Sequence, residues 1–189
     1  LVQITSLMAR GIPARGGSTR LPRKNLQRIN DTPLVALAIK QAKASSYIQR
    51  VFVTTDDNEI EGVAREYGAE VIIRPSLLSQ GEPGSIMNTI KHALNHMDKY
   101  LGYVPTIVVL LQPTSPCRIV EDIDGTIRLL LDEGNLSADT LCGGEQNGAV
   151  YVSRTAVHTR LNLVTAIPTS HYFMPPERST DVDDLVDYE

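Results

Sequence analysis

The amino-acid sequence predicts an α/β protein in which a mostly parallel sheet carries helices on both faces, giving three layers. Short apolar runs of the strand type alternate along the chain with segments of helical periodicity, as in proteins built on parallel sheets. The most apolar run, TIVVLL at 106–111, has the continuous hydrophobicity of a strand that is buried on both faces. The length of 189 residues suits a single domain over 1–189.

The first half of the chain is expected to supply three strands and two helices. Thr32 can cap the first helix, with Pro33 in its first turn, and Asp56 or Asp57 can cap the second. Gly68 stands where a glycine commonly ends a helix. The strands are predicted over 4–12, 51–55 and 71–73, and the helices over 33–45 and 57–67.

The second half continues this alternation on either side of the most apolar run. Gly134 closes a helix, and Asn147-Gly148 forms either a hairpin turn or a turn that faces a ligand. A further short helix precedes the last strand. Helices are predicted over 84–99 and 119–133, and strands over 106–111, 149–152 and near 163–168.

The composition, with 42% hydrophobic and 21% charged residues, is ordinary for a soluble globular protein. The net charge of −4 argues against a general nucleic-acid binder. No apolar run is long enough to cross a membrane, so no membrane partner is expected. The two cysteines, Cys117 and Cys142, do not make a disulfide framework, which favours a reducing, cytoplasmic location.

The loop 12–25, which reads IPARGGSTRLPRKN, follows the first strand and has the features of an anion-binding turn. Gly16 and Gly17 allow positive φ and a close approach of a ligand to the main chain. Four basic residues add positive charge, and no acidic residue precedes Asp31: Arg15, Arg20, Arg23 and Lys24. A nucleoside triphosphate fits such a loop, although an ordinary glycine turn with solvated basic residues is the alternative. A Walker P-loop is disfavoured because Gly17 stands where that motif needs lysine.

Asp181-Val182-Asp183 is the second feature that points to a site. In an extended segment, residues two apart point to the same face, so both carboxylates can face one ligand. Carboxylate oxygens on one face suit Mg²⁺, which also binds phosphates. The alternative is a solvated acidic tail.

Two further segments are expected beside the basic loop, because ligands of parallel sheets bind beyond the carboxyl ends of the strands. Asp56-Asp57 follows one strand, and Gln112-Pro113-Thr114-Ser115 follows the most apolar one. The amide and hydroxyls of the second segment suit a polyhydroxylated ligand, although an ordinary strand-to-helix turn would also explain it. The sequence offers no Ser-His-Asp or Cys-His arrangement, so hydrolase chemistry has little support.

Six segments, in this order along the chain, resemble the acylneuraminate cytidylyltransferase family, the CMP-sialic acid synthetases. They read IPARGGSTRLPRKN, VTTDD, RPSLLS, LLQPTSPCR, NGAVYV and PERSTDVD, and they cover nearly the whole chain. The resemblance implies a Rossmann-like nucleotidyltransferase fold. It also implies that CTP and a sialic acid-like nine-carbon 2-keto sugar acid react, with Mg²⁺, to a CMP-sugar and pyrophosphate in a homodimer.

The resemblance assigns roles to the residues that match the motifs of the family. The nucleotide-binding positions would be Ala14, Arg15, Gly16, Gly17, Ser18, Lys24, Asn25, Arg74 and Ser85. The sugar-binding positions would be Gln112, Asn147, Tyr151, Val164 and Thr165. Asp181 and Asp183 would hold the metal and, with Arg15 and Lys24, would be the catalytic residues.

Two departures from the family pattern bear on these expectations. The family has a long dimerisation arm between the regions of Asp139 and Asn147, where this chain has only 140–146. Either this member lacks the arm or residues are omitted from the sequence, and we favour the second reading. Sialic acid enzymes tend to have two aromatic residues where this chain has Val164 and Thr165, which favours a sialic-like acid such as legionaminic or pseudaminic acid.

Two other functions remain open at this point. The first is a cytidylyltransferase for an eight-carbon keto sugar acid, of the CMP-KDO synthetase type. The second is a nucleotide-binding module without turnover. The PERSTDVD and NGAVY segments favour the nine-carbon substrate, and the presence of Lys24 with both aspartates favours an enzyme.

Overall fold

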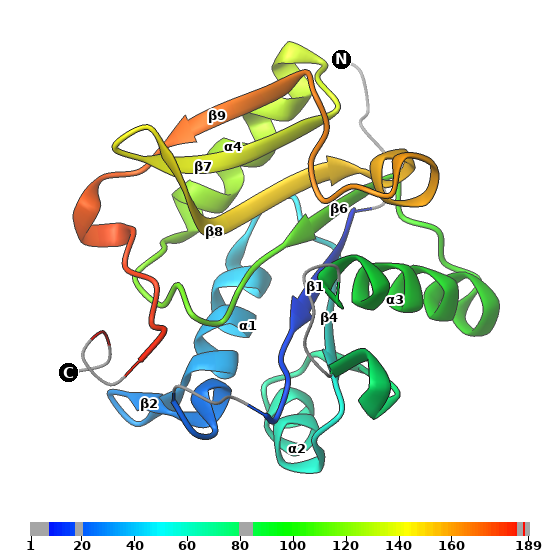
Figure 1. Ribbon diagram of the computed structural model, residues 1–189, viewed down its shortest axis with the longest axis vertical. Coiled ribbons are helices and arrows are strands. Elements are labelled where there is room, and N and C mark those ends of the chain that lie inside the picture. The colour runs from blue at the N-terminus through cyan, green and yellow to red at the C-terminus, as the bar shows by residue number, and fades with distance from the viewer. Residues whose placement is uncertain (1–7, 18–20, 80–84, 185–186, 188–189) are drawn as a thin grey trace.

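The computed structural model describes residues 8–17, 21–79, 85–184 and 187, which build one seven-stranded sheet and a small two-stranded one (Figure 1). The order in the large sheet is β5-β4-β1-β6-β8-β7-β9. Within this described sheet only β8 runs antiparallel to its neighbours, so the predicted mostly parallel sheet is confirmed. The strands are β1 Met8–Pro13, β4 Arg50–Thr55, β5 Glu70–Ile73, β6 Ile107–Leu110, β7 Ser137–Cys142, β8 Glu145–Arg154 and β9 Thr169–Phe173.

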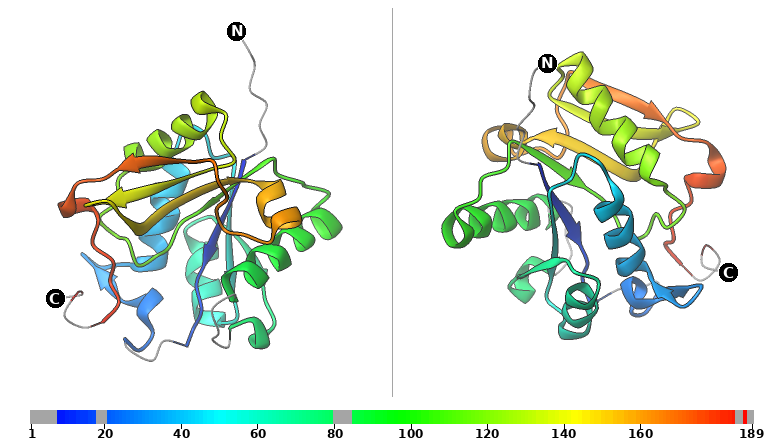
Figure 2. Two further views of the ribbon diagram at one scale, coloured as in Figure 1. Left: turned by 45° about the horizontal axis from the view of Figure 1, so that its top comes forward. Right: turned by 180° about the vertical axis from the view of Figure 1, so that it is seen from behind.

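Helices cover both faces of the sheet, as the sequence predicts. α1 (Leu34–Ala44), α2 (Asn58–Glu66) and α4 (Val120–Glu133) bury their apolar residues against one face, and Figure 2 shows α1 and α4 in front of the sheet when it is seen from behind. α3 (Ser85–Leu101) packs on the other face, where its side chains join residues of β4, β5 and β6. No helix of the described residues is long and apolar enough to cross a membrane.

The predicted helix ends agree with the structure where a specific backbone bond defines them. The Asp57 side chain caps α2 by accepting hydrogen bonds from the amides of Glu59 and Ile60, at 2.9 and 3.0 Å. Gly68 has φ +77° after α2, and Gly134 has φ +68° after α4, so both glycines end helices in the left-handed conformation.

The expected cap of α1 is wrong. Thr32 and Pro33 instead form strand β3, which pairs with β2 (Arg28–Ile29) in a small hairpin. Its turn residues, Asn30 and Asp31, both have positive φ, which suits a two-residue hairpin connection. The N-cap position of α1 is Pro33, whose side chain cannot cap.

A hairpin that the sequence analysis did not predict joins β7 to β8. Its turn is Gly143-Gly144, with φ of +60° and +91°, so the hairpin turn considered at Asn147-Gly148 is wrong. Those two residues lie within β8, next to an irregularity of the β7–β8 pairing. The chain thus passes from β7 to β8 without an arm, and the omission of arm residues remains a prediction.

The last strand lies later in the chain than expected. Residues 163–168 form a connection whose backbone is held by side chains of neighbouring strands: Ser153 donates to the Val164 carbonyl, and Ser137 accepts from the Ala166 amide. Pairing with β7 begins only at Thr169. The short helix expected before the last strand is η3 (Val157–Leu161).

Candidate active site

The loop that leaves β1 begins beside β4. The buried Ala14 donates its amide to the Thr54 carbonyl at 3.1 Å, and Arg15 follows it as an exposed residue. Neither Gly16 nor Gly17 has positive φ, so that reason for the glycines is wrong. Close packing explains Gly16 instead, because a Cβ atom there would lie 2.3 Å from Asp57 Oδ2.

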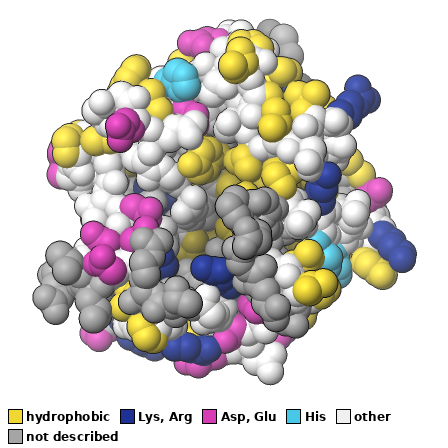
Figure 3. Space-filling model, viewed as in Figure 1, with side chains coloured by type: hydrophobic (Ala, Val, Ile, Leu, Met, Phe, Trp, Pro, Cys, Tyr) yellow, Lys and Arg dark blue, Asp and Glu magenta, His cyan; other side chains and the backbone are white. Residues whose placement is uncertain are grey.

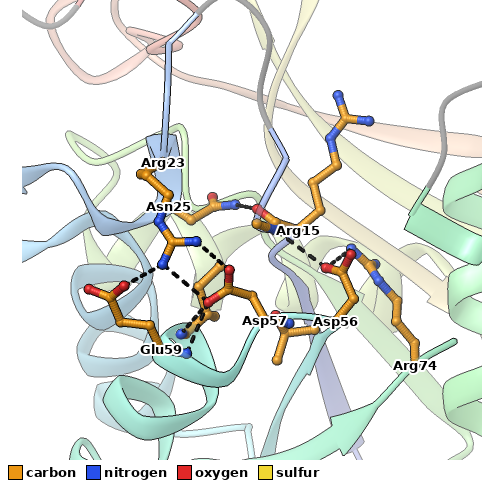
Figure 4. Close-up of polar contacts among 10 residues, drawn as sticks. Arg15, Arg23, Asn25, Asp56, Asp57, Glu59 and Arg74 are labelled. Atoms are coloured by element: carbon orange, nitrogen blue, oxygen red, sulfur yellow. Dashed lines mark hydrogen bonds and ion pairs between the residues drawn. The ribbon is translucent and has the colours of Figure 1, made fainter. Parts of the chain in front are cut away.

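Asp56 and Asp57, at the carboxyl end of β4, hold the loop at both of its ends (Figure 4). Asp56 accepts the amide of Gly16 at 3.3 Å and pairs with Arg74 at 3.9 Å. Asp57 caps α2 and also pairs with Arg23, near the far end of the loop. Hydrogen bonds from the Ile60 amide and Arg23 outweigh the opposing effect of burial, and the pKa of Asp57 is lowered.

The charges of the loop are partly neutralised by residues distant in sequence, contrary to the expectation from the sequence. Arg23 contacts both Asp57 and Glu59, so its guanidinium is committed to the start of α2. Figure 4 shows the side chain of Arg15 pointing away from these carboxylates. Arg23 therefore anchors the loop, and Arg15 is the arginine that lies toward the open side of the site.

Arg74 follows β5 and is almost completely buried. It donates to the Thr89 hydroxyl of α3 at 3.3 Å. Burial lowers its pKa, Asp56 opposes that shift, and Arg15 adds to it, so Arg15 and Arg74 act on each other electrostatically. Ser85 begins α3, but its side chain lies outside the described part of the structure, as does all of Ser18.

Lys24 and Asn25 lie in the short helix η1 (Lys24–Leu26) and connect the loop to other parts of the site. Asn25 donates its side-chain amide to the Arg15 carbonyl at 2.9 Å. Lys24 Nζ donates to Asp183 Oδ1 at 2.8 Å, across 159 positions of sequence. The structure thus brings the basic loop and the two aspartates of the acidic segment together.

The acidic segment is fixed between these two aspartates. Val182 donates its amide to the Thr114 carbonyl at 2.7 Å and is buried against Leu21 and Leu34. Before it, Arg178 of η4 (Pro176–Arg178) contacts the fully buried Asp122 of α4 at 3.0 Å. The aspartates are therefore held on both sides by contacts with the body of the domain.

Asp181 has the character of a cation ligand. Its Oδ1 is buried, and no described residue offers it a hydrogen bond. Burial raises the pKa of Asp181, the Thr114 hydroxyl lowers it, and the charge of Asp183 raises it again. The described residues contain no cluster of three or more His, Cys, Asp or Glu side chains that could hold a metal. Two carboxylates with an unpaired oxygen fit a Mg²⁺ ion that takes its remaining ligands from phosphate and water.

The predicted sugar-binding residues lie on β8, just after β6, and in the connection 163–168. Gln112 follows β6, and a Cβ atom on Gly148 would lie 3.6 Å from its Nε2, so β8 passes close to it. Tyr151 is half-buried with Val164 in the apolar cluster under α3, and Thr165, also half-buried, follows Val164 in the chain. Burial raises the pKa of Tyr151, and the charges of Asp139 and Asp181 raise it further.

Asn147 differs from the other sugar-binding candidates. Its side chain donates to Ser179 at 3.0 Å and accepts from Thr140 at 2.6 Å, and it also accepts the amide of Ala149 at 3.2 Å. These bonds tie β8 to β7 and to the segment before the aspartates. The structure therefore gives the Asn147 amide a structural role.

Arg118 is a residue of the site that the sequence analysis missed. It is fully buried and donates to the carbonyls of Gln112 and Ala149 and to the side chain of Gln41. Burial lowers its pKa to about 9, and Asp122 opposes the shift. An arginine at the end of a proline-stiffened turn was its only sequence signal, and such a residue is ordinarily exposed.

Figure 3 shows the face that carries the site. Basic and acidic side chains gather in its lower half, below a band of hydrophobic side chains.

Comparison with known proteins places these observations in a family. The family model described as Cytidylyltransferase matches residues 12–169. An N-acylneuraminate cytidylyltransferase of Escherichia coli is 28% identical over 94% of this chain and 49% of its own length. A CMP-N,N'-diacetyllegionaminic acid synthase of Legionella pneumophila is 37% identical over 62% of this chain and 50% of its own. A 3-deoxy-manno-octulosonate cytidylyltransferase of Acinetobacter baumannii is 29% identical over 85% of this chain and 68% of its own.

The chain spans about half the length of the first two of these relatives. Among solved structures, a CMP:2-keto-3-deoxy-manno-octonic acid synthetase complexed with CTP has a TM-score of 0.75 at 18% identity, covering 96% of this chain and 95% of its own. A Mycobacterium tuberculosis protein solved with manganese has a TM-score of 0.65 at 16% identity, covering 97% of this chain and 96% of its own. The structural likenesses speak for the fold, and the expected Rossmann-like nucleotidyltransferase fold is confirmed.

Proposed function

Because the chain belongs to the cytidylyltransferase family, we propose that it transfers CMP from CTP to the anomeric hydroxyl of a sialic acid-like nine-carbon 2-keto sugar acid, with release of pyrophosphate. The contact between Lys24 and Asp183 is the observation that carries this proposal. It joins the basic loop to a pair of carboxylates, as a reaction on a nucleoside triphosphate requires.

The nucleotide lies, in this proposal, along the loop from Ala14 to Asn25. The exposed main chain of Gly17 and the adjoining half-buried Gly16 approach the phosphates, and Arg15 and Lys24 supply positive charge. Ser18 belongs to the same proposed set. Arg74, with Ser85 at the start of α3, contacts the cytosine side.

Asp181 and Asp183 hold the metal, which we take to be Mg²⁺, because hard carboxylate oxygens suit this ion. Held by these two carboxylates, Mg²⁺ would polarise the phosphate and would lower the free-energy cost of the charge that develops on it. The unpaired Oδ1 of Asp181 supports this assignment.

The residues of the chain act mainly by positioning and by charge. The sugar hydroxyl oxygen forms a bond to the α-phosphorus, the bond from that phosphorus to the β-phosphate bridging oxygen breaks, and pyrophosphate leaves as the hydroxyl proton is lost. Arg15 and Lys24 stabilise the negative charge on the phosphates and on the leaving group. Gln112, Tyr151, Val164 and Thr165 line the proposed sugar side, where they orient the attacking hydroxyl, and Asn147 supports them by holding β8 in place.

The choice of a nine-carbon acid and of a homodimer is also part of the proposal. The similarity to the Escherichia coli protein extends over 94% of this chain, which supports the sialic acid type. That alignment runs over 213 residues, more than the 189 of this chain, so the relative has inserted residues. The prediction that a dimerisation arm is missing from the region 139–147 is one way to account for such residues. We place the reaction in the cytoplasm, where CTP is available.

An eight-carbon keto sugar acid is the second candidate substrate, since the Acinetobacter relative named above is a 3-deoxy-manno-octulosonate cytidylyltransferase. The chemistry would be the same and the acid shorter. A nucleotide-binding module without turnover would keep the loop but would have no need of the unpaired oxygen on Asp181.

Pyrophosphate release tests these alternatives in one assay. The protein is incubated with Mg²⁺, each of the four common nucleoside triphosphates and a panel of eight- and nine-carbon keto sugar acids. We expect release with CTP alone and with a nine-carbon acid. Release only with an eight-carbon acid would select the second substrate, and no release with any pair would support the module.

Asp183→Ala provides the matching test of the site. The side chain is half-exposed, so the fold should survive, but the metal and Lys24 lose a partner. We expect turnover to fall about a hundredfold to a thousandfold, by analogy with the loss of one charge-stabilising group. Asp184→Ala, in the next residue of the chain, is the control and should keep normal turnover. Normal activity of Asp183→Ala with Mg²⁺ would refute the metal role.

A further inference from the structure

A second polar cluster lies on the same sheet face as Tyr151, on the two strands beyond it. Asp139 of β7 is opposite Tyr151 in the pairing of β7 with β8, and His171 of β9 is opposite Asp139. The His171 ring lies 2.6 Å from Asp139, measured from Nδ1 to Oδ1. Gln146 donates to the other oxygen of the same carboxylate.

The two residues of this pair differ in exposure, which leaves one side of the His171 ring able to contact a ligand. Asp139 is fully buried, whereas the side chain of His171 is 46% exposed. A carboxylate can only accept hydrogen bonds, so Nδ1 of His171 carries the proton and Nε2 is turned toward the exposed side. Asp139 thereby fixes both the tautomer and the orientation of an imidazole that can still bind something else.

The sheet order places this cluster on one side of the proposed reaction centre. From β6, with Gln112 at its end, the strands follow in the order β8, β7 and β9. His171 is therefore two strands beyond Tyr151, which corresponds to about 10 Å at the usual strand spacing. That distance is comparable to the length of a nine-carbon sugar acid whose anomeric end is held near Asp181.

α4 packs against β7, β8 and β9 on the opposite face of the sheet (Figure 1). On the face that carries Tyr151, the imidazole of His171 and the amide of Gln146 cover the carboxylate of Asp139, and the connection 163–168 lies over Ser137 and Ser153. A ligand that starts at Tyr151 and extends toward β9 would therefore meet the partly exposed ring of His171.

We propose that His171, positioned by Asp139, is a specificity-determining contact for the substituents of the sugar acid that lie farthest from its anomeric carbon. This inference rests on the proposed function. Nε2, the ring nitrogen that is not bonded to Asp139, can form a hydrogen bond with a hydroxyl group or with an acylamino group. A shorter eight-carbon acid without acylamino groups does not reach it. His171 thus favours the longer, acylated acids.

Two substitutions of the histidine separate this role from a purely structural one. His171→Asn keeps a side-chain N–H near the position of Nδ1, which preserves the partner of Asp139 but removes Nε2. His171→Gln places a polar group near the position of Nε2. KM and kcat are measured for CTP, for an acylated nine-carbon acid and for an eight-carbon acid, and the oligomeric state is checked by light scattering.

For His171→Asn we expect KM for the acylated nine-carbon acid to rise about tenfold, as for the loss of one well-placed hydrogen bond. KM for CTP and for the eight-carbon acid should stay as in the wild-type protein, and His171→Gln should recover most of the loss. Unchanged KM values in His171→Asn would overturn the inference. A variant that changes only its oligomeric state and keeps its kinetics would also overturn the inference. The inference would likewise fail if the wild-type protein turned over only the eight-carbon acid.

The failure of the proposed function would look different. The wild-type protein would then release no pyrophosphate with CTP and any acid, and this inference would fall with it. If the wild-type protein is active and the histidine variants have the same KM values as the wild type, the proposed function stands and only this inference is wrong.

Asp139 is a positioning residue in this scheme, and a double-mutant cycle tests it. Asp139→Asn weakens the hold on the imidazole, so it should raise KM for the nine-carbon acid with little change in kcat. In the His171→Asn background the same substitution should have no further effect on KM, because the two residues act as a unit. Additive effects on KM would contradict the coupling. The unfolding temperature of each variant separates these effects from a loss of folded protein.

Discussion

Gly16 and Gly17 are neighbouring glycines, but only Gly16 lies where a larger side chain would clash with its surroundings. Gly16 packs against the carboxylate of Asp57, whereas a Cβ atom on Gly17 would meet no described atom within 4 Å. Asp57 in turn cannot move freely, because it caps α2 and pairs with Arg23. One atom added at Gly16 therefore disturbs three contacts at once.

We predict that Gly16→Ala lowers the free energy of unfolding by about 1–2 kcal/mol, as for the loss of a helix cap with local overpacking. Gly17→Ala should change it by less than about 0.5 kcal/mol, the range usual for surface substitutions. Urea titrations of both variants measure the difference. Equal stability of the two variants would contradict the packing argument.

His158, in η3, is a buried histidine outside the site. Its Nδ1 lies 2.8 Å from the Leu163 carbonyl, so this nitrogen must carry the proton. Nε2 is buried without a described hydrogen-bond partner. Burial lowers the pKa of His158, more than the bond to Leu163 raises it. The folded protein therefore favours the neutral ring.

This shift predicts a loss of stability in acid. Above pH of about 6.5, the ordinary value of histidine, the ring is neutral in both states and its contribution is complete. As the pH falls below that value, the unfolded chain takes up the proton first, so stability declines until the folded pKa is reached. We expect His158→Asn, which keeps a donor toward Leu163, to flatten the fall of the melting temperature between about pH 7 and 5. An unchanged slope would rule out His158 as its source.

At the scale of elements, the sequence predicted the apolar strands of the large sheet but missed the polar β7. β4 and β6 consist mainly of buried apolar residues, which periodicity detects. β7 contains Ser137, Asp139 and Thr140, all buried, which have partners only after the chain has folded. Their partners lie on β8 and β9, up to 32 positions away. Local strand propensity takes no account of such distant partners.

The site shows the same division. The sequence predicts the loop after β1 and the two aspartates as local motifs, because their glycines, charges and spacing involve only residues that are close in the sequence. The commitment of Arg23 to Asp57 and Glu59 is a tertiary contact, and so is the burial of Arg118. Both arginines look alike in sequence, and neither their anchoring nor their burial follows from neighbours in the chain.

The segment that carries the aspartates depends on η4. Arg178 donates to the buried carboxylate of Asp122 through Nε and Nη2, at 3.1 and 3.0 Å. We predict that Arg178→Gln lowers turnover about tenfold or more, because small displacements of positioned groups are costly. The melting temperature should also fall, since Asp122 would remain buried without its charged partner.

Arg160→Gln, at an exposed position in η3, is the control and should leave turnover and melting temperature unchanged. The two variants are compared by steady-state kinetics at several Mg²⁺ concentrations. Normal turnover of Arg178→Gln at all of them would show that the aspartates do not depend on this anchor.

At the scale of the molecule, β9 is an edge of the sheet that carries exposed apolar residues. Phe173 is 70% exposed, and Ile167, in the connection before β9, is 90% exposed. Exposed apolar side chains on an edge strand mark a surface where another chain can pack. We therefore assign the proposed homodimer contact to this edge.

Phe173→Asp should convert the proposed dimer to a monomer without unfolding it. Leu77→Asp is the matched control, because Leu77 is also exposed but lies in η2 (Ser76–Ser79), after the strand at the opposite edge of the sheet. Light scattering after gel filtration measures both masses. A dimer that persists in Phe173→Asp would place the interface elsewhere.

The salt bridge between Lys24 and Asp183 also has a consequence for biosynthesis. All seven strands of the large sheet and the four long helices precede Asp181 and Asp183 in the sequence, so the ribosome makes these elements before the two aspartates. Lys24 can pair with Asp183 only after the segment with the aspartates has left the ribosome. The proposed metal site is therefore completed only after the scaffold that holds it.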